Sequence, residues 1–416
     1  MQTLYNLIIK LYGIAIFCAS VNKPKAKQWV NGRKDWRKKL SDNVNKLPHS
    51  KTIWVHCASY GEFEQGAPLI ETIKNQKRGY NMVVTFFSPS GYMAFNKTPL
   101  ADGVFYLPLD TTTNAREFID ILKPGIAIFV KYEFWLNYLK ELRFRNIPAY
   151  LVSATFKPHH PFFKWYGSIF IDSLFTFKTI YLQDIQSQKL LKKINVHHTK
   201  ITGDTRFDRV YQNKLTEYED RIIHNFKGNQ YLFIAGSTWP NDDDYILETL
   251  KQTQNIGFRY VIAPHEVNDS NLAKLYEKLN RAGFQFTTYT NFQEGAQILV
   301  VNCMGVLSKI YKYADFSYVG GGFNTNGIHN MLEPTVFGKP SSFYGKNYTK
   351  FNEIIELKAI SCILNLNENL TLTNVLNNYA KLNLVDIENK LSEYFKARIG
   401  STEVVVKDIF AIIKSE

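Results

Sequence analysis

The chain has no paired cysteines and neither of the common nucleotide-binding glycine sequences. Its four cysteines are far apart and form no C-x-x-C pair, which argues against a disulfide framework and a cysteine zinc site. Neither G-x-G-x-x-G nor G-x-x-x-x-G-K-[ST] occurs in the 416 residues, so the dinucleotide fingerprint and the P-loop are absent. A content of 45% hydrophobic and 21% charged residues excludes disordered, low-complexity and collagen-like proteins. What remains is a globular chain long enough for two domains.

Positive charge is concentrated at the amino end of the chain. The formal net charge is +13, and residues 1–50 contribute +8 of it, with ten Lys and Arg against Asp35 and Asp42. A nucleic-acid-binding protein more often spreads its Lys and Arg over the folded domains, among aromatic residues. We therefore expect an anionic membrane surface as a partner, and no nucleic acid.

The first twenty residues have the composition of a membrane-associated helix. Residues 4–20 are apolar apart from Asn6, Lys10 and the tyrosine hydroxyls. The apolar residues recur at helical spacing, at Leu4, Leu7, Ile8, Leu11, Ile14, Ala15 and Cys18. The pattern predicts a membrane-associated helix over residues 1–22 that lies in the interface or crosses the bilayer, with a core helix as the alternative. The basic connecting segment 23–50 follows it, which keeps the rest of the chain on the cytoplasmic side.

From residue 51 onward, short β-branched runs alternate with helical patterns such as 115–122 and 186–193. The alternation predicts parallel sheets covered by helices. A polar stretch near 208–230 separates an N-terminal domain, 51–207, from a C-terminal domain, 208–416. We expect two doubly wound Rossmann-like α/β domains that face a central cleft. The expected strands are 52–58, 82–87, 104–107, 126–130, 149–153, 179–182 and 200–202 in the first domain, and 231–235, 259–263, 285–288, 297–301, 316–319 and 341–343 in the second.

Two acidic residues follow expected strands of the first domain. Glu62 lies in Ser59-Tyr60-Gly61-Glu62, after the first strand, where a carboxylate can reach the ligand-binding edge of a parallel sheet and accept a proton. The alternative is a capping box made by Ser59 and Glu62. Glu133 lies in Lys131-Tyr132-Glu133, after the strand 126–130. Lys131 is suited to hold an acidic substrate while Glu133 positions a hydroxyl group, and a surface ion pair is the alternative.

A glycine-rich stretch is the strongest signal in the second domain. Gly320-Gly321-Gly322 follows the expected strand 316–319 and precedes a short helix. We expect the backbone N–H groups of these glycines and the amino end of the helix to approach a phosphate closely. Glu333 is expected to accept hydrogen bonds from ribose hydroxyls. A turn-rich connection is the alternative.

Two further strand ends are expected to line the same nucleotide pocket. Ser237 and Thr238 follow the strand 231–235, while Pro264 and His265 follow the strand 259–263. Each pair alone is also typical of a helix N-cap. The nearby run Asp242-Asp243-Asp244 is interpreted as the first turn of a helix, where carboxylates complement the helix dipole, and not as a metal site.

Taken together, these motifs resemble those of the 3-deoxy-D-manno-octulosonic acid (Kdo) transferases of lipopolysaccharide synthesis, which are GT-B glycosyltransferases. The resemblance runs in order along nearly the whole chain. It rests on Ala58-Ser59-x-Gly61-Glu62, Lys131-x-Glu133-x-Trp135, Gly236-Ser237-Thr238 and His329-Asn330-x-Leu332-Glu333-Pro334.

The resemblance implies transfer of Kdo from CMP-Kdo to the lipid A precursor (lipid IVA) at the cytoplasmic face of the inner membrane. It implies inversion at the anomeric carbon without a metal or another cofactor. By matched position, Glu62 is the catalytic base, Glu133 and Lys131 belong to a second active-site motif, and Ser59 and Gly61 are acceptor-side candidates. The positions matched to the donor side are Ser237, Thr238, Pro264, His265, Gly305, Gly322, Gly327, His329, Asn330 and Glu333.

Other functions stay open on the sequence alone. The nearest is a GT-B glycosyltransferase that uses a UDP-sugar and a lipid acceptor. A non-catalytic, membrane-bound sugar-nucleotide binding protein is a second alternative, although two acidic residues beside a glycine-rich stretch favour an enzyme. An NAD-dependent oxidoreductase is a third, and the missing glycine fingerprint argues against it.

Overall fold

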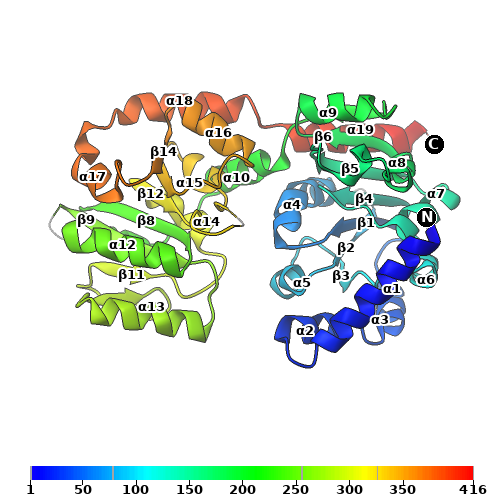
Figure 1. Cartoon of the computed structure of the whole chain (residues 1–416), viewed down its shortest axis with the longest axis horizontal. Coiled ribbons are helices and arrows are strands. Elements are labelled where there is room, and N and C mark those ends of the chain that lie inside the picture. Colours follow the sequence, from blue (N-terminus) through cyan, green and yellow to red (C-terminus); the bar gives the residue numbers. More distant parts are fainter. Residues whose placement is uncertain (1, 77–78, 254–255, 326, 416) are drawn as a thin grey trace. The chain divides into compact units, whose positions relative to one another are not determined.

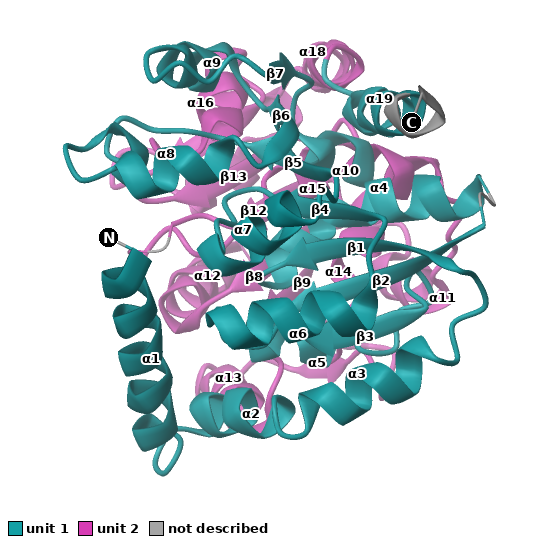
Figure 2. Cartoon of the chain, turned by 90° about the vertical axis from the view of Figure 1, so that its right-hand side faces the viewer, with its two compact units in different colours: residues 1–209, 398–416 teal, residues 210–397 magenta. Residues whose placement is uncertain are grey.

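The computed structural model describes residues 2–76, 79–253, 256–325 and 327–415, without the side chains of residues 412–415 (Figure 1). It divides into two compact units, coloured separately in Figure 2. Unit 1 comprises residues 1–209 and 398–416, and unit 2 comprises residues 210–397. The chain passes from one unit to the other within helix α10 (Thr205–Leu215), and again between α18 (Leu384–Lys396) and α19 (Ser401–Ser415).

Unit 1 contains a seven-stranded parallel sheet in the order β3-β2-β1-β4-β5-β6-β7. Its strands are β1 Lys51–Cys57, β2 Tyr80–Phe86, β3 Gly103–Tyr106, β4 Ile126–Val130, β5 Ala149–Ala154, β6 Phe177–Leu182 and β7 Thr199–Ile201. Besides α10 and α19, its helices are α1 Gln2–Ala19, α2 Pro24–Gly32, α3 Trp36–Val44, α4 Tyr60–Asn75, α5 Pro89–Phe95, α6 Thr112–Leu122, α7 Leu136–Phe144, η1 Pro161–Phe163, α8 Ser168–Leu174 and α9 Ile185–Lys192.

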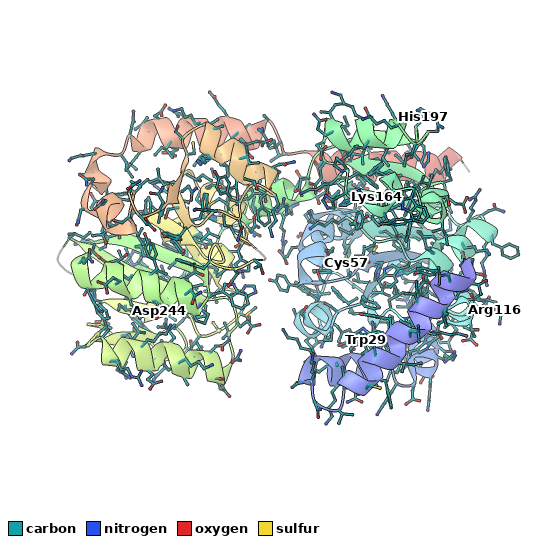
Figure 3. The ribbon with its side chains drawn as sticks, viewed as in Figure 1. Trp29, Cys57, Arg116, Lys164, His197 and Asp244 are labelled. Atoms are coloured by element: carbon teal, nitrogen blue, oxygen red, sulfur yellow. The ribbon has the colours of Figure 1, made fainter. Side chains whose placement is uncertain are left out.

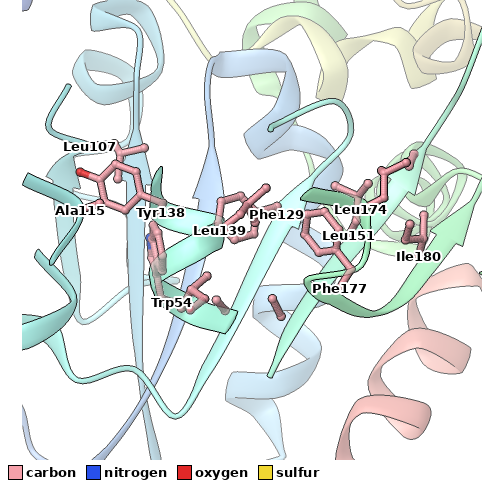
Figure 4. Packing of buried hydrophobic residues seen from close by; sticks show 14 of the residues in the cluster. Trp54, Leu107, Ala115, Phe129, Tyr138, Leu139, Leu151, Leu174, Phe177 and Ile180 are labelled. Carbon is pink, nitrogen blue, oxygen red and sulfur yellow. The ribbon is translucent and has the colours of Figure 1, made fainter. Parts of the chain in front are cut away.

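The central strands of unit 1 are apolar because both faces of the sheet are covered. Trp54 of β1 and Phe129 of β4 pack on one face with residues of α6 and α7, among them Phe118 and Tyr138 (Figure 4). The opposite face packs against α4 and α19. This two-sided burial fixes the central strands and leaves their carboxyl ends to carry the site.

Unit 2 contains a second seven-stranded parallel sheet, in the order β10-β11-β9-β8-β12-β13-β14. Its strands are β8 Tyr231–Thr238, β9 Phe258–Pro264, β10 Phe286–Thr288, β11 Ile298–Val300, β12 Phe316–Val319, β13 Ser341–Tyr344 and β14 Ile363–Leu366. Besides α18, its helices are α11 Arg221–Lys227, α12 Pro240–Thr253, α13 Asp269–Arg281, α14 Leu307–Ile310, η2 Tyr311–Tyr313, α15 Leu332–Thr335, α16 Asn352–Ala359, α17 Leu372–Asn377 and η3 Tyr379–Lys381. Helices α12, α13 and α17 pack on one face, and α11 and α14 on the other.

The predicted doubly wound α/β class is confirmed, and each predicted strand overlaps an observed one. The edge strand β14 was not predicted. It has four residues, and its Leu364 and Asn365 are only partly buried, so it forms no continuous apolar run.

The end of the chain differs from the predicted domain 208–416. Helix α19 packs on α4 of unit 1, where Val405, Ile409 and Phe410 join the core (Figure 2). Asp208 of α10 accepts hydrogen bonds from the backbone N–H groups of Gly400 (2.6 Å) and Thr402 (2.7 Å) at the start of α19. The apolar pattern of a helix does not indicate which of two sheets the helix packs on. The prediction therefore assigned residues 398–416 to the second domain, which they follow in the sequence.

Helix α1 lies on unit 1 with Gln2, Tyr5 and Asn6 inward, while Thr3 and Lys10 are exposed. Tyr5 Oη donates to the buried carboxylate of Asp110 (2.5 Å), and Gln2 and Asn6 are hydrogen-bonded to Asn137 (3.0 and 2.9 Å). The predicted apolar stripe faces outward instead of entering a core, as Leu4, Leu7, Ile8, Leu11 and Ile14 are all more than half exposed. Within the described residues, α1 is the one helix long and apolar enough to cross a membrane.

One cation of the basic segment is not on the surface. The Arg33 guanidinium is buried, stacks on the Trp29 ring at 3.8 Å, and donates to the carbonyls of Phe87 (2.7 Å) and Leu107 (2.8 Å). Burial lowers its pKa to about 9. Arg33 therefore ties the end of α2 to the loops that follow β2 and β3, and the remaining cations of the segment account for its surface charge.

Candidate active site

In each unit, the predicted motifs flank the point where the strand order reverses. In unit 1 this point lies between β1 and β4, and in unit 2 between β8 and β12. Ser59 and Glu62 follow β1, whose last residue, Cys57, is labelled in Figure 3, and Lys131 and Glu133 follow β4. Ligands of doubly wound sheets bind at the carboxyl ends of the strands at such reversal points. The topology therefore brings each pair of motifs to the position expected for a binding site.

Glu62 lies in the first turn of α4, and its carboxylate accepts hydrogen bonds from the Ser59 hydroxyl and from the backbone N–H groups of Ser59 and Glu62. Ser59 is the N-cap residue, but its hydroxyl donates to Glu62 instead of accepting from the helix backbone. The alternative of a complete capping box is thus only half realised, because only the glutamate reaches back. A Cβ added to the neighbouring Gly61 would have no atom within 4 Å.

The electrostatics of Glu62 link it to the second motif. Burial raises its pKa above the ordinary value of 4.5, the Lys131 ammonium lowers it, and the Glu133 carboxylate raises it. These three side chains therefore lie close enough to influence one another. A partly buried carboxylate with a raised pKa is a stronger base than an exposed glutamate, which suits it to accept a proton.

Two residues at these strand ends have a backbone conformation that is unfavourable for side chains with a Cβ. Lys131, directly after β4, has φ +70°, and Ser237, near the end of β8, has φ +53°. The left-handed region costs a non-glycine residue roughly 1–2 kcal/mol. Such strain is found at functional sites, and these two residues lie beside the reversal point of their unit, although six other non-glycine residues of the described chain also have a positive φ.

The glycines of unit 2 allow close backbone contacts. A Cβ on Gly322 would lie 1.5 Å from the Tyr344 carbonyl oxygen, and Gly321 has φ +97°. Two of their N–H groups are already used, since Gly320 donates to the Gly236 carbonyl (2.9 Å) and Gly321 to Asp242 (2.9 Å). These two N–H groups are therefore already paired within unit 2, and the expected approach of a phosphate to the glycine segment stays a prediction for Gly322. The following helix, α15, has four residues, too few for an effective dipole at its amino end.

Asp242 holds the glycine segment in place. Besides Gly321, it accepts hydrogen bonds from the Tyr318 hydroxyl (2.6 Å) and the Trp239 backbone N–H (2.9 Å). The interpretation of Asp242-Asp243-Asp244 as the first turn of a helix is confirmed by α12. Across the described ranges, no group of three or more His, Cys, Asp or Glu side chains lies so as to hold a metal ion. Metal-free chemistry stays a prediction.

Three aromatic rings stack at the predicted donor side. His265, which follows β9, stacks on both Trp239 and His329, with ring centroids 4.9 and 4.0 Å away. Trp239 Nε1 donates to His329 Nε2 (2.8 Å), which places the His329 proton on Nδ1. Burial, with a smaller effect of His265, lowers the pKa of His329 to about 4, so the ring is neutral at pH 7. The structure thus brings His265 and His329 together, and adds Trp239, which the sequence analysis missed.

The other donor-side candidates lie in the same unit. Thr238 ends β8 beside Pro264 of β9, and its carbonyl accepts from the His265 N–H (2.9 Å). The Asn330 amide donates to Glu333 (3.2 Å). Gly327 has φ +89°, and Gly305, with φ +83°, precedes Leu307, which lies next to Gly236.

We expect Trp239→Phe to weaken CMP binding about threefold to tenfold, because it removes the hydrogen bond to His329 and keeps the stacked ring. A lost hydrogen bond contributes about 0.5–1.5 kcal/mol, which corresponds to that range. Isothermal titration calorimetry measures it, with Trp165→Phe, on an almost fully exposed ring, as the matched control. Unchanged affinity for Trp239→Phe would show that the His329 tautomer does not matter for binding.

Comparison with known proteins points to one family. Residues 34–209 match the family model of 3-deoxy-D-manno-octulosonic-acid transferase (kdotransferase). A Kdo transferase of Haemophilus influenzae is 28% identical over 324 residues, covering 74% of each chain, and one of Aquifex aeolicus is 27% identical over 314 residues, covering 73% of this chain and 78% of the relative. The chain is therefore similar to Kdo transferases over about three quarters of its length, and residues 34–209 carry the sequence pattern of their family model.

One relative is longer than this chain. It is the bifunctional glycosyltransferase/methyltransferase of Fusobacterium nucleatum, which is 25% identical over 409 residues. The match covers 93% of this chain and 62% of that relative's length. This chain therefore corresponds to only part of the bifunctional protein.

The fold of this chain is shared with solved structures of low sequence identity. A putative UDP-N-acetylglucosamine 2-epimerase of Listeria monocytogenes has a TM-score of 0.56 at 13% identity, covering 88% of this chain and 96% of that one. MurG of Acinetobacter baumannii has a TM-score of 0.52 at 11% identity, covering 87% and 99%. These likenesses support the GT-B fold alone.

Proposed function

We propose that the protein transfers Kdo from CMP-Kdo to the lipid A precursor, lipid IVA. The observation that carries the proposal is the position of the motifs. The acidic pair Glu62 and Glu133, with Lys131, flanks the strand reversal of unit 1, while the glycine segment and the Trp239, His265 and His329 stack flank that of unit 2. Similarity to Kdo transferases supports the choice of sugar, and in this proposal the site of unit 1 serves the acceptor and that of unit 2 binds the donor.

In the proposed reaction, Glu62 takes the proton of an acceptor hydroxyl as its oxygen attacks the anomeric carbon of Kdo. The bond from that carbon to the phosphate oxygen breaks, and CMP leaves with the bonding electron pair. A single displacement inverts the anomeric centre. CMP is a phosphate monoester of low basicity, so its departure requires less help from a divalent cation than a more basic leaving group would.

Lys131 and Glu133 have different roles in this scheme. The Lys131 ammonium is suited to the carboxylate or phosphate of a bound substrate. Burial is the main cause of the raised pKa of Glu62, and the Glu133 carboxylate adds to it. Neither carboxylate is required to bind a metal.

The nucleotide distinguishes this proposal from its nearest rival, a GT-B enzyme that uses a UDP-sugar. A ligand that binds only the folded state raises the melting temperature. We expect CMP to raise it and UDP to leave it unchanged at equal concentration. A shift with UDP and none with CMP would favour the rival.

We further propose that α1 docks the protein on the cytoplasmic face of the inner membrane. Gln2, Tyr5 and Asn6 contact the rest of unit 1, so the outward face of α1 offers lipid an apolar strip beside the exposed Lys10. The adjoining basic segment attracts anionic headgroups. The acceptor is a phosphorylated glycolipid of that leaflet, so docking brings the base to its substrate.

Replacing Leu7 and Leu11 together with aspartate is expected to lower binding to anionic vesicles at least tenfold. Each leucine is about half exposed on α1, and burying a leucine side chain contributes roughly 1.5–3 kcal/mol. Sedimentation with vesicles measures the loss, and Val385→Asp, on an exposed position of α18, is the control. Equal sedimentation of the double variant and the unaltered protein would remove α1 from the docking surface.

A further inference from the structure

The loop 155–167, which connects β5 to α8, presents a tryptophan to solvent. Trp165 is 95% exposed, more than any other large apolar residue that the structure describes, and Tyr166 beside it is 44% exposed. A single exposed apolar residue is ordinary on a protein surface. The structure and the charge around Trp165 therefore decide what this pair of rings can do.

The loop 155–167 holds Trp165 at the tip of closed turns. Phe162 is only 2% exposed and belongs to the core of unit 1. The Lys164 N–H donates to the Pro161 carbonyl (3.1 Å), and the Gly167 N–H donates to the Lys164 carbonyl (2.9 Å). A Cβ on Gly167 would lie 2.4 Å from the Pro161 carbonyl oxygen, so the turn requires glycine. The exposure of Trp165 is thus built into a fixed turn with a buried base.

The buried side of the same loop packs on the second active-site motif. The Phe162 ring lies 4.7 Å from that of Phe134, and the His160 ring lies 4.3 Å from that of Tyr132, measured between centroids. Tyr132 and Phe134 alternate in the sequence with the candidate residues Lys131 and Glu133. The loop that carries Trp165 is therefore a direct neighbour of the candidate site in unit 1.

The loop 155–167 and helix α1 lie at one edge of the sheet. The loop follows the carboxyl end of β5, while α1 binds Asp110 after β3 and Asn137 after β4. Helix α7 joins them, because it begins next to α1 at Asn137 and contacts α8 through Arg143 and Asp172 (3.1 Å). Figure 2 shows α1 and α8 on the same side of unit 1.

The charge of this region suits an anionic surface. No Asp or Glu occurs between Glu141 and Asp172, whereas the loop contains Lys157 and Lys164, and Lys164 is exposed (Figure 3). Trp and Tyr are enriched where a bilayer meets water, and nearby cations attract anionic headgroups. A second copy of this chain, with a net charge of +13, is a poorer match for the same surface.

We propose that Trp165 and Tyr166 are a second membrane contact, which enters the headgroup region of an anionic bilayer beside α1. The inference rests on the proposed function, since it deepens the docking assigned to α1. A single helix lying on a membrane leaves the protein free to roll about the helix axis. A second contact at the same edge of the sheet fixes which side of unit 1 faces the lipid, and places the candidate site next to the headgroups.

Fluorescence quenching by brominated lipids tests the contact directly. The full-length protein has six tryptophans, and Trp165→Phe removes one of them while keeping an aromatic ring. With vesicles of brominated phosphatidylcholine and phosphatidylglycerol in equal parts, we expect bound protein to lose a quenched component that bound Trp165→Phe lacks. Equal quenched fractions in the two proteins would overturn the proposal.

Vesicle partitioning provides a second measurement with a matched control. We expect Trp165→Ala to lower partitioning onto the same vesicles, made without bromine, about threefold to tenfold. Phe144→Ala is expected to leave it unchanged. Phe144 is also strongly exposed, but it ends α7, which leads back to the amino end of β5 and so to the opposite edge of the sheet. Equal losses in both variants, or no loss in either, would overturn the proposal.

Two further outcomes separate this inference from its alternatives. Self-association in solution that Trp165→Ala abolishes, with vesicle binding unchanged, would assign the surface to a second copy of the chain and overturn the proposal. Neither lipid measurement uses CMP-Kdo or an acceptor. Kdo transfer without quenching of Trp165 would therefore overturn this inference alone, and quenching without Kdo transfer would support it while contradicting the proposed function.

Discussion

Glu62→Gln is expected to reduce Kdo transfer by about 10²–10⁴-fold in kcat, the usual contribution of a general base. The amide keeps the shape of the side chain and cannot take the proton of the attacking hydroxyl. Donor binding is expected to stay unchanged, because the donor candidates belong to unit 2. Glu71→Gln, on a more exposed position of the same helix α4, is the matched control. Near-normal turnover of Glu62→Gln would exclude this residue as the base.

The same residue predicts the pH dependence of the reaction. Glu62 acts as a base only when it is deprotonated, and its pKa is raised above 4.5, so activity is retained above that raised pKa and lost as the pH falls through it. Lys131→Met removes the cation that lowers the pKa of Glu62, and so moves the acid limb of kcat/KM to higher pH. Glu133→Gln removes the carboxylate that raises it, and so moves the limb to lower pH. Shifts in the same direction would contradict this electrostatic arrangement.

Gly322→Ala is expected to produce the second large effect, a loss of at least tenfold in affinity for CMP. The new Cβ would lie 1.5 Å from the Tyr344 carbonyl oxygen, so one of two backbone segments must move. Forcing extra atoms into a closely packed site costs about 1–3 kcal/mol, and here the movement displaces the glycine segment that Asp242 holds.

Calorimetric titration with CMP and the melting temperature together test this expectation. Gly125→Ala is the control, since the nearest atom to its added Cβ is 3.8 Å away and its φ is not in the left-handed region. Normal CMP affinity for Gly322→Ala would show that the glycine segment lies outside the donor site.

The strands and the positions of the motifs could be predicted from the sequence because parallel strands buried on both faces are short apolar runs, and site residues follow their carboxyl ends. The residues that support the site could not be predicted in this way. Trp54, Thr85 and His56 meet through the register of two strands, and Trp239 reaches His329 across ninety residues of sequence. Their individual positions in the sequence carry no sign of these contacts.

The hydrogen bonds of the glycine segment and the packing of α19 could not be predicted either, because each had more than one partner available. The N–H groups of Gly320 and Gly321 were expected to meet a phosphate, but a carbonyl and Asp242 of the same unit accept them instead. Helix α19 has an apolar face that suits either sheet, and its hydrogen bonds to Asp208 and its packing on α4 decide for unit 1. The apolar stripe of α1 was read correctly as a pattern, and the polar contacts of Tyr5 and Gln2 determine that it faces outward.

Mass spectrometry of the product formed by the full-length protein from CMP-Kdo and lipid IVA, with EDTA present, tests the central claim most directly. The proposed mechanism predicts that lipid IVA gains the mass of one or more Kdo residues, that CMP is released in equal amount, and that Glu62→Gln forms almost no product. Release of CMP without any gain in the mass of lipid IVA, or transfer only from a UDP-sugar, would contradict it.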